Sequence, residues 1–416
     1  MAAAETAAGL AAFEGRGAGT DAERRAARWL AKQVGRGPRE ARLDTFWCRP
    51  NWALAHAWHC LLAVVGSLLM VAHAALGGVV VLVALLSVLA DALAGRSLGR
   101  RLTPERASQN VVSLSPPGST PRQTMAGEGP PVTLIVTANY DAGRTGVAYR
   151  DLLRTPAARL KHLAAGGTLT PGWLGWLAVE LLWLLGIAAL RMTGGGTAVG
   201  ILQLVPTAAL VVELALLLEL SASGFGPAAG DNASGVGVAL ALVRALDAAP
   251  PRNIGVELVL QGAGDGTMTG LGQHLRRHRD ELRPGSTVVL GIGPGGAGAP
   301  RWWFSDGPLI PLRYLARLRE SAQRVAAGAG REPVGHRGRG VSPALPARVR
   351  GLPALTIGCV DRRGVASRSH QPGDLPGALD PAAMDALLEF ALLLVDEIDG
   401  GLGRVTGRSG AAAAAA

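Results

Sequence analysis

Carboxylate, amide and imidazole side chains recur in this chain at positions that follow expected strands. Asn139 and Asp141 come directly after a β-branched run, and Asp231, Asp265 and His370 follow further along the chain. Because open parallel sheets place their sites at the carboxyl ends of strands, we expect these side chains to lie at one edge of a sheet. Asp, Glu, His and Cys are the usual ligands of zinc, so this set of residues suits a zinc site.

Each of these residues also has an ordinary structural explanation. Asp231 precedes a helical segment and is a residue type that commonly caps helices. Asp265 stands between two glycines, Gly264 and Gly266, which is a composition typical of a turn. His370 precedes Gln-Pro and has the setting of a loop histidine. The residues taken singly therefore leave both the structural and the functional interpretation open.

Strands and helices that would position these residues alternate along the chain. Strands are predicted at residues 110–114, 132–137, 256–261, 287–292 and 353–357, and helices at residues 22–34, 234–246, 270–282 and 381–398. This alternation predicts a three-layer α/β/α fold with a mostly parallel central sheet. Residues 115–129 are predicted to form a polar loop. Residues 400–416, which end in six alanines, are predicted to be a disordered tail.

Two motifs resemble those of the co-catalytic zinc aminopeptidases, metallopeptidase family 28, which also has glutaminyl-cyclase and non-catalytic receptor relatives. The family's Asp-Asn-Ala-Ser-Gly is complete as Asp231-Asn232-Ala233-Ser234-Gly235. The family's His-Thr-Pro-x-Asp is similar to Ser369-His370-Gln371-Pro372-Gly373-Asp374. The resemblance covers about residues 21–46, 109–147 and 226–398. It implies a zinc aminopeptidase-like fold.

The resemblance implies one complete half of a two-zinc site. In the family, one zinc is held by the bridging aspartate, a glutamate and the final histidine, which correspond here to Asp231, Asp265 and His370. The second zinc also needs a histidine and a later aspartate, and these positions are Asn139 and Gly293. The aspartate that orients the family's histidine remains as Asp141 in Asn139-Tyr140-Asp141-Ala142. A single zinc ion is therefore expected.

The residue that would act as general base is missing. The family's Gly-Ala-Glu-Glu supplies the base and then a ligand, whereas this chain has Gly262-Ala263-Gly264-Asp265, so that Gly264 occupies the position of the base. General acid–base catalysis commonly contributes about 10² to 10⁴ in rate. No catalytic residue is predicted, and peptidase activity is expected to be weak or absent.

Two pairs of long apolar segments interrupt the α/β pattern. Residues 52–90 contain no Asp, Glu, Lys or Arg, which is enough chain for two crossings of a hydrocarbon core of roughly 30 Å. Residues 173–192 and 198–218 form a second pair around a glycine-rich turn. Core helices of soluble proteins are the alternative, but such helices are rarely apolar for twenty residues. We predict two transmembrane hairpins.

These boundaries divide the chain into six parts. They are a basic N-terminal region with an amphipathic helix (1–50), hairpin 1 (51–95), the first part of the aminopeptidase-like domain (107–170), hairpin 2 (171–220), the remainder of the domain (221–399) and the tail (400–416). The second hairpin is inserted between Asn139 and Asp231, so the cleft is expected to lie next to the bilayer.

The charge distribution predicts the orientation in the membrane. The chain has 41 Lys and Arg against 31 Asp and Glu, a formal net charge of +10. Arginines flank the first hairpin, from Arg24 to Arg49 and from Arg96 to Arg106, while the turns between the apolar segments carry almost none. This positive-inside pattern predicts an integral protein of the cell membrane with a cytoplasmic α/β domain. The chain has three cysteines, an odd number that does not suggest a set of paired disulfides, and this suits a reducing compartment.

Three functions fit these observations, and whether the protein is an enzyme stays open. The first is a membrane pseudoenzyme whose degenerate domain binds a ligand or acts as a scaffold, with one zinc. The second is an active single-zinc aminopeptidase, hydrolase or acyl-transfer enzyme that acts on membrane-proximal peptides or amines. The third is a scaffold that binds no metal. The expected partners are the lipid bilayer and a membrane-proximal peptide or protein, and not nucleic acid.

Overall fold

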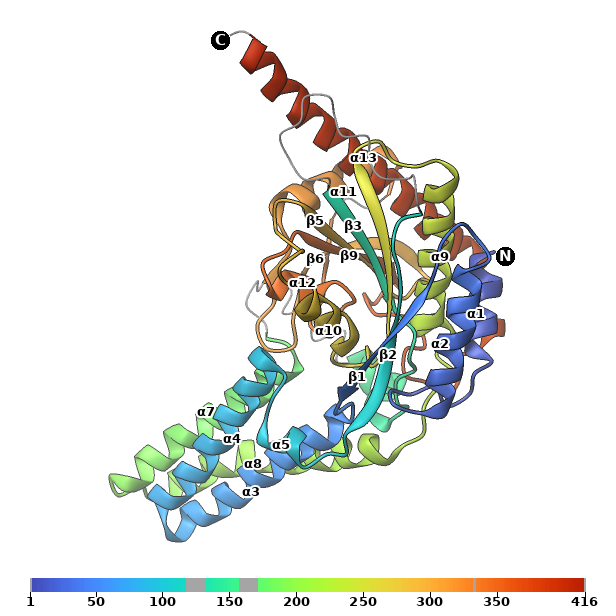
Figure 1. Cartoon of the computed structure of the whole chain (residues 1–416). Helices are drawn as coiled ribbons and strands as arrows, with labels where there is room; N and C mark the ends of the chain where they lie inside the picture. Colours follow the sequence, from blue (N-terminus) through green and yellow to red (C-terminus); the bar gives the residue numbers. More distant parts are fainter. Residues whose placement is uncertain (1, 117–131, 157–170, 332–333, 415–416) are drawn as a thin grey trace.

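A computed structural model describes residues 2–116, 132–156, 171–331 and 334–414 of the chain. It consists of an α/β domain from which four long helices project as a separate bundle (Figure 1). Most of the polar loop predicted at residues 115–129 lies outside the described residues.

A single mixed sheet forms the centre of the α/β domain. Its strand order is β1-β2-β4-β3-β5-β9-β6-β7, and β8 pairs with β6. The strands are β1 (Arg42–Cys48), β2 (Arg106–Ser113), β3 (Val132–Asn139), β4 (Ile254–Gln261), β5 (Thr287–Ile292), β6 (Ala299–Asp306), β7 (Leu312–Arg313), β8 (His336–Arg337) and β9 (Ala354–Val360). The central strands β4, β3, β5 and β9 pair in parallel, as the sequence predicts.

The outer pairs of the sheet are antiparallel, whereas the central strands pair in parallel. β1 pairs antiparallel with β2, β2 with β4, β6 with β9 and β6 with β7. A parallel strand needs a crossover of a dozen or more residues. Only residues 293–298 separate β5 from β6, so β6 returns in the opposite direction along the far side of β9.

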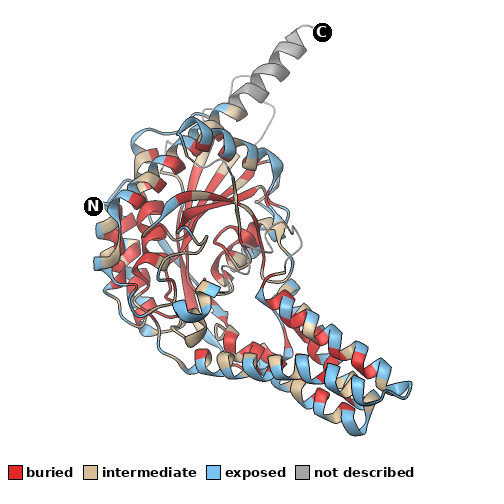
Figure 2. Cartoon of the chain, turned by 180° about the vertical axis from the view of Figure 1, so that it is seen from behind, coloured by how far each residue is buried: buried red, intermediate tan, exposed pale blue. Residues whose placement is uncertain are grey.

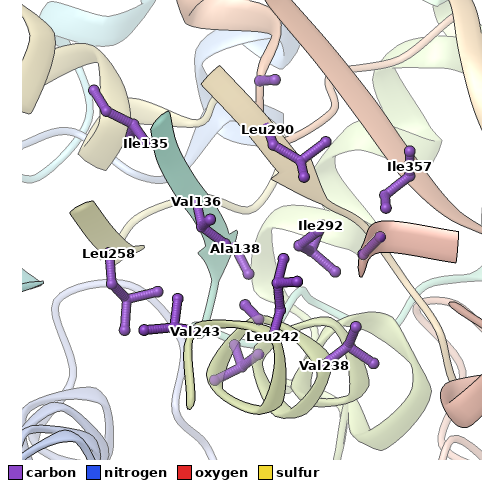
Figure 3. Packing of buried hydrophobic residues seen from close by; sticks show 14 of the residues in the cluster. Ile135, Val136, Ala138, Val238, Leu242, Val243, Leu258, Leu290, Ile292 and Ile357 are labelled. Atoms are coloured by element: carbon purple, nitrogen blue, oxygen red, sulfur yellow. The ribbon is translucent and has the colours of Figure 1, made fainter. Parts of the chain in front are cut away.

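Helices cover both faces of the sheet. One face carries α9 (Ser234–Ala248) together with α1 (Ala3–Ala11), α2 (Asp21–Val34) and α13 (Pro381–Ala414), and the other carries α10 (Thr269–Arg277) and α12 (Leu345–Val349) (Figure 1). A further helix, α11 (Ala316–Gly328), packs against α13. Leu242 of α9 points at the sheet beside Val136 and Ile292, and all three side chains are buried (Figure 3). This core fixes the ends of the central strands.

Several elements differ from the sequence prediction. The helix α10 ends at Arg277, whereas the predicted helix extends to residue 282. The strand β2 begins at Arg106, whereas the predicted strand begins at residue 110. The backbone of α13 continues as helix to Ala414, where a disordered tail is predicted. Alanine has the highest intrinsic helix propensity, so an alanine-rich segment readily extends a helix that is already formed.

The four helices of the bundle are α3 (Trp52–Ala72), α4 (Ala74–Ala94), α7 (Trp173–Met192) and α8 (Thr197–Ala222). Each is long and apolar enough to cross a membrane. Much of the outer surface of the bundle is exposed (Figure 2), and it carries side chains such as Leu68 and Leu204. An apolar exterior of this kind is what lipid-facing helices present.

The start of α3 is bonded to the end of α8, and the first turn of α7 is fixed to the α/β domain. Asn51 caps α3 by accepting a hydrogen bond from the N–H of Leu54 at 3.2 Å, and it donates to the carbonyl of Ser221 at 3.3 Å. The N–H of Gly175 in α7 donates to the carbonyl of Pro308 at 3.0 Å. A Cβ on Gly172 would lie 2.3 Å from that same oxygen, so only glycine allows this approach.

Candidate functional site

The predicted site positions come together at the carboxyl ends of the central strands. A cavity of about 370 Å³ is lined by Asp231, Asp265, His370, Asn139 and Gly293. A second cavity of about 150 Å³ shares Asp265 and His370 with the first and is also lined by Asp141. The sequence therefore selected residues from five separate segments that meet in space.

Asp141 holds the loop that follows β4. Its Oδ1 accepts a hydrogen bond from the N–H of Gly264 at 2.8 Å, and its Oδ2 accepts one from the N–H of Asp265 at 3.0 Å. The side chain is fully buried, and burial together with the charge of Asp265 raises the pKa of Asp141. With Asn139 in place of a histidine, Asp141 thus positions Asp265 rather than an imidazole.

Asp265 and His370 form a close pair. The Nε2 of His370 lies 3.4 Å from the Oδ1 of Asp265, and its Nδ1 lies 3.0 Å from the carbonyl oxygen of Arg144. Because a carbonyl oxygen only accepts hydrogen bonds, Nδ1 carries the hydrogen of this bond. The other ring nitrogen, Nε2, faces Asp265. The ring of His370 stacks on Tyr149 with 4.1 Å between centroids.

Burial and charge act in opposite directions on the imidazole. Burial lowers the pKa of His370, but the carboxylates of Asp265 and Asp231 and the hydrogen bond to Arg144 outweigh it, so the pKa is raised. Burial also raises the pKa of Asp265, and the neighbouring His370 opposes that shift. The titrations of Asp265 and His370 are therefore linked to each other.

Asp231 is positioned by the motif that carries His370. It lies in the short helical segment η2 (Ala229–Ala233), and its N–H donates to the Oδ2 of Asp374 at 2.9 Å. The N–H of Gly230 donates to the Oδ1 of Asp374 at 2.7 Å, and the hydroxyl of Ser369 donates to the Oδ2 of Asp231. The N-cap of α9 is Ala233 and no side chain caps that end, so Asp231 is not a helix cap.

The degenerate positions differ in the space around them. A Cβ on Gly264 would lie 2.2 Å from the Cβ of Asn139, which leaves no room for the side chain of a general base. A Cβ on Gly293 would meet nothing closer than the carbonyl of Ile357 at 3.4 Å, so that position is open. Packing therefore closes position 264 to a side chain, whereas position 293 leaves space for one.

Sequence reasoning missed three residues that shape the site. Gly143 allows the pair to form, because a Cβ there would lie 2.2 Å from the Cε1 of His370 and 2.7 Å from the Oδ1 of Asp265. Tyr149 stacks on His370, and Trp52 places its Nε1 3.5 Å from the Oδ2 of Asp265. The position of Gly143 just after a polar strand end could have indicated its role from the sequence. No local sequence pattern indicates that Tyr149 or Trp52 belongs to the site.

The fit of these residues to zinc is partial. Two carboxylates and an imidazole are suitable donors, and the contact of Nδ1 with the carbonyl of Arg144 is the type of hydrogen bond that orients zinc-binding histidines. In the described part of the chain, however, no three His, Cys, Asp or Glu side chains are gathered closely enough to hold a metal ion. Asp265 and His370 are the pair that would hold a zinc ion, whereas Asp231 accepts a hydrogen bond from Ser369.

Comparisons with known proteins agree with this fold. The model of peptidase family M28 matches residues 219–395, which is less than half of the chain. The structure of BSAP, a zinc aminopeptidase from Bacillus subtilis, is similar with a TM-score of 0.53 and 13% identity, over 95% of this chain and 94% of that one. The structure of Porphyromonas gingivalis glutaminyl cyclase gives a TM-score of 0.51 and 13% identity, over 95% and 97% of the two chains. No curated protein matches the chain significantly.

The family match and the structural neighbours establish that the chain resembles peptidase family M28. Its α/β domain has the zinc aminopeptidase-like fold. At 13% identity, the neighbours show the fold alone and leave activity to the residues of this chain.

Proposed function

We propose that this protein is a membrane-embedded relative of the M28 peptidases whose cleft binds an aminoacyl or peptidyl ligand without hydrolysing it efficiently. The observation that carries this proposal is the packing of Gly264 against Asn139, which leaves no space for a carboxylate at the position of the general base. The cavity beside it retains Asp231, Asp265 and His370, so ligand binding is the property that remains.

The four apolar helices support the placement in a membrane. All four have the length and hydropathy of membrane spans, and the arginines that flank the first pair support a cytoplasmic location of the α/β domain. The ligand would then be a membrane-proximal peptide or amine, because the cavity is lined in part by the first residues of α3 and α7.

One zinc ion is part of the proposal. Asp265 and His370 supply a carboxylate and an imidazole at the cavity, and Asp231, which also lines it, would be the third ligand. When bound, the ion would polarise a carbonyl oxygen of the ligand.

Turnover and binding measured on the same preparation test this function. The full chain in lipid nanodiscs would be assayed for hydrolysis of leucine p-nitroanilide and for binding of leucine amide by calorimetry, with and without zinc. We expect wild type to bind leucine amide and to hydrolyse the anilide no faster than Asp265→Ala. The matched control is Asp280→Ala, whose side chain is 88% exposed and lines neither cavity. Zinc-dependent hydrolysis that Asp265→Ala abolishes and Asp280→Ala preserves would overturn the proposal.

The second candidate is hydrolysis or acyl transfer at a single zinc. It is favoured by the 3.4 Å approach of His370 to Asp265 at the cavity, since this arrangement retains two of three ligands. The same turnover assay decides between the two functions. A scaffold that binds no metal would show neither leucine amide binding nor a response to zinc.

A further inference from the structure

The segment between the first two helices carries an arginine that reaches the back of the site. Arg16 lies between α1 and α2, and its side chain is fully buried. A guanidinium without water must donate its hydrogen bonds to the protein, because a buried donor that lacks a partner is costly. The partners of Arg16 therefore show what this buried cation holds together.

The first partners of Arg16 lie at the end of β3. Its Nε donates to the carbonyl of Tyr140 at 3.0 Å, and its backbone carbonyl accepts a hydrogen bond from the N–H of Ala142 at 2.9 Å. Tyr140 and Ala142 are the residues on either side of Asp141. Arg16 therefore fixes the backbone of the residue whose carboxylate holds the N–H of Asp265.

The same guanidinium holds the loop that leads into Asp231. Its Nη1 donates to the carbonyl of Pro227 at 2.5 Å, and its Nη2 donates to the carbonyl of Ala228 at 2.6 Å. These two residues come directly before η2, which contains Asp231. Because the planar guanidinium holds its donors in a rigid fork, one group sets how the end of β3 and this loop lie relative to each other.

Arg16 also supplies positive charge near two buried carboxylates. Burial lowers the pKa of Arg16 to about 10, so the group remains protonated at neutral pH, and the charges of Asp141 and Asp374 oppose that shift. These two carboxylates have matching tasks, because Asp141 accepts from the N–H of Asp265 and Asp374 accepts from the N–H of Asp231. A buried carboxylate is costly unless a positive charge or hydrogen bonds compensate it.

Gly17 extends this support toward His370. A Cβ on Gly17 would collide with the ring of Phe225, so the backbone packs directly against that ring. The Cζ of Arg144 lies 4.5 Å from the centroid of the same ring. The carbonyl of Arg144 is the group that orients the imidazole of His370. The segment of Arg16 and Gly17 therefore contacts the supports of all three residues proposed to bind zinc.

We propose that Arg16 is a positioning residue of the zinc site, whose guanidinium fixes Asp231 and Asp265 relative to each other through the backbone segments that carry them. This inference rests on the proposed function, because it assigns a role toward the zinc ion and the ligand of that site. Arg16 lines neither cavity, so it acts without touching the ligand.

The binding affinities of Arg16 variants test this role. Zinc affinity and leucine amide affinity would be measured by calorimetry on the full chain in nanodiscs, the latter also without zinc, at a temperature at which the variants are folded. Substitution of a residue that supports metal ligands typically costs about 10- to 100-fold in metal affinity. We expect Arg16→Met to bind zinc at least about tenfold more weakly than wild type, and to bind leucine amide more weakly with and without zinc.

Arg16→Lys separates the charge from the fork of donors. A lysine keeps the positive charge but cannot reproduce the planar arrangement of the guanidinium, so its affinities should lie between those of wild type and Arg16→Met. This variant also keeps the test valid if Arg16→Met fails to fold.

Arg39 provides the matched control. It is also a buried arginine, since its guanidinium pairs with Asp247 at 2.7 Å and donates to the carbonyls of Leu114 and Val256. It lines neither cavity. Arg39→Met and Arg39→Lys should therefore lower the melting temperature, as the Arg16 variants do, but keep the wild-type affinities for zinc and leucine amide.

The visible spectrum of the cobalt-loaded protein gives a readout that lower stability alone would not change. Co²⁺ binds to the same kinds of ligand as Zn²⁺, and its visible absorption depends on the number and arrangement of those ligands. We expect the spectrum of Arg16→Lys to differ from that of wild type, and the spectrum of Arg39→Lys to match it.

Each outcome decides one of the two proposals. Arg16 variants that keep the wild-type affinities and spectrum would overturn the positioning role and leave the proposed function standing. An equal loss of affinity in the Arg16 and Arg39 variants would assign the effect to the stability of the domain, and would also overturn the positioning role. Failure of wild type to bind either zinc or leucine amide would overturn the proposed function, and the positioning role with it.

Discussion

Gly264 offers a direct test of whether the position of the general base is closed by packing. A methyl group at this position would lie 2.2 Å from the Cβ of Asn139, 3.0 Å from its Cγ and 3.1 Å from the Oδ1 of Asp141. Asn139 is the last residue of β3, and Asp141 is tied by two hydrogen bonds to the same loop, so neither neighbour is free to move away. Overpacking of this kind costs about 1–3 kcal/mol.

The melting temperature of the full chain in nanodiscs measures this cost. We expect Gly264→Ala to melt roughly 2–12 °C below wild type, because each 1 kcal/mol shifts the melting temperature of a domain of this size by roughly 2–4 °C. The control is Gly285→Ala, since an added Cβ there meets no atom within 4 Å. Gly264→Glu should be destabilised at least as much and gain no hydrolysis of leucine p-nitroanilide.

A double variant isolates the contact. Asn139→Gly removes both atoms that the new methyl group would meet first, so the cost of Gly264→Ala should largely vanish in the Asn139→Gly background. If Gly264→Ala melted at the same temperature as wild type, position 264 would not be closed by packing. An equal cost of Gly264→Ala in both backgrounds would also contradict the prediction, since the strain would then not arise from Asn139.

The remaining predictions concern the neighbours of the site. Gly143→Ala should separate His370 from Asp265, because its Cβ would lie 2.2 Å from the imidazole, and leucine amide binding should fall at least about tenfold; binding equal to wild type would contradict the geometry. Asp306, 1% exposed and with no hydrogen-bond partner for its Oδ2 among the described residues, has a pKa that burial raises from 3.8 to about 6. Its folded-state pKa lies above the unfolded one, so its contribution to stability is present below about pH 4 and is lost as the pH rises through about 6. Asp306→Asn should therefore gain melting temperature relative to wild type as the pH rises from about 4 through about 6. Parallel pH profiles of wild type and Asp306→Asn would be evidence against the shift. Asp374→Ala should destabilise both motifs of the site by about 2–4 kcal/mol, because it removes two buried hydrogen bonds from the N–H groups of Gly230 and Asp231, and an unchanged melting temperature would count against that role.

Much of the fold could be predicted from the sequence because its central elements carry strong local patterns. β3 and β5 are rich in β-branched and aliphatic residues, and the hairpins are apolar over whole membrane-spanning lengths. β1 was not predicted, because its segment Arg42–Cys48 contains charged residues and is only partly buried. The antiparallel margin at β6 depends on which strand it pairs with, and no local pattern specifies that pairing.

The site was predictable only where its residues belong to motifs. Asp231, Asp265 and His370 were selected from sequence, and the structure places them at one cavity. The interpretation of Asp265 as a turn residue and the functional interpretation are compatible, because a loop between glycines is what presents this carboxylate beside His370. Trp52 and Trp173 could not be selected, because within apolar stretches a tryptophan at a helix end indicates a membrane interface rather than a binding cavity.

The zinc content of the purified protein shows whether Asp231, Asp265 and His370 form the remaining half of a two-metal site. The zinc content of the purified protein would be measured by inductively coupled plasma mass spectrometry for wild type, Asp231→Ala, Asp265→Ala and His370→Ala. The control is His73→Ala, at the turn between α3 and α4. We predict about one zinc ion per chain in wild type and in the control, and almost none in the other three variants. Two zinc ions per chain, or a zinc content that His370→Ala leaves unchanged, would contradict it.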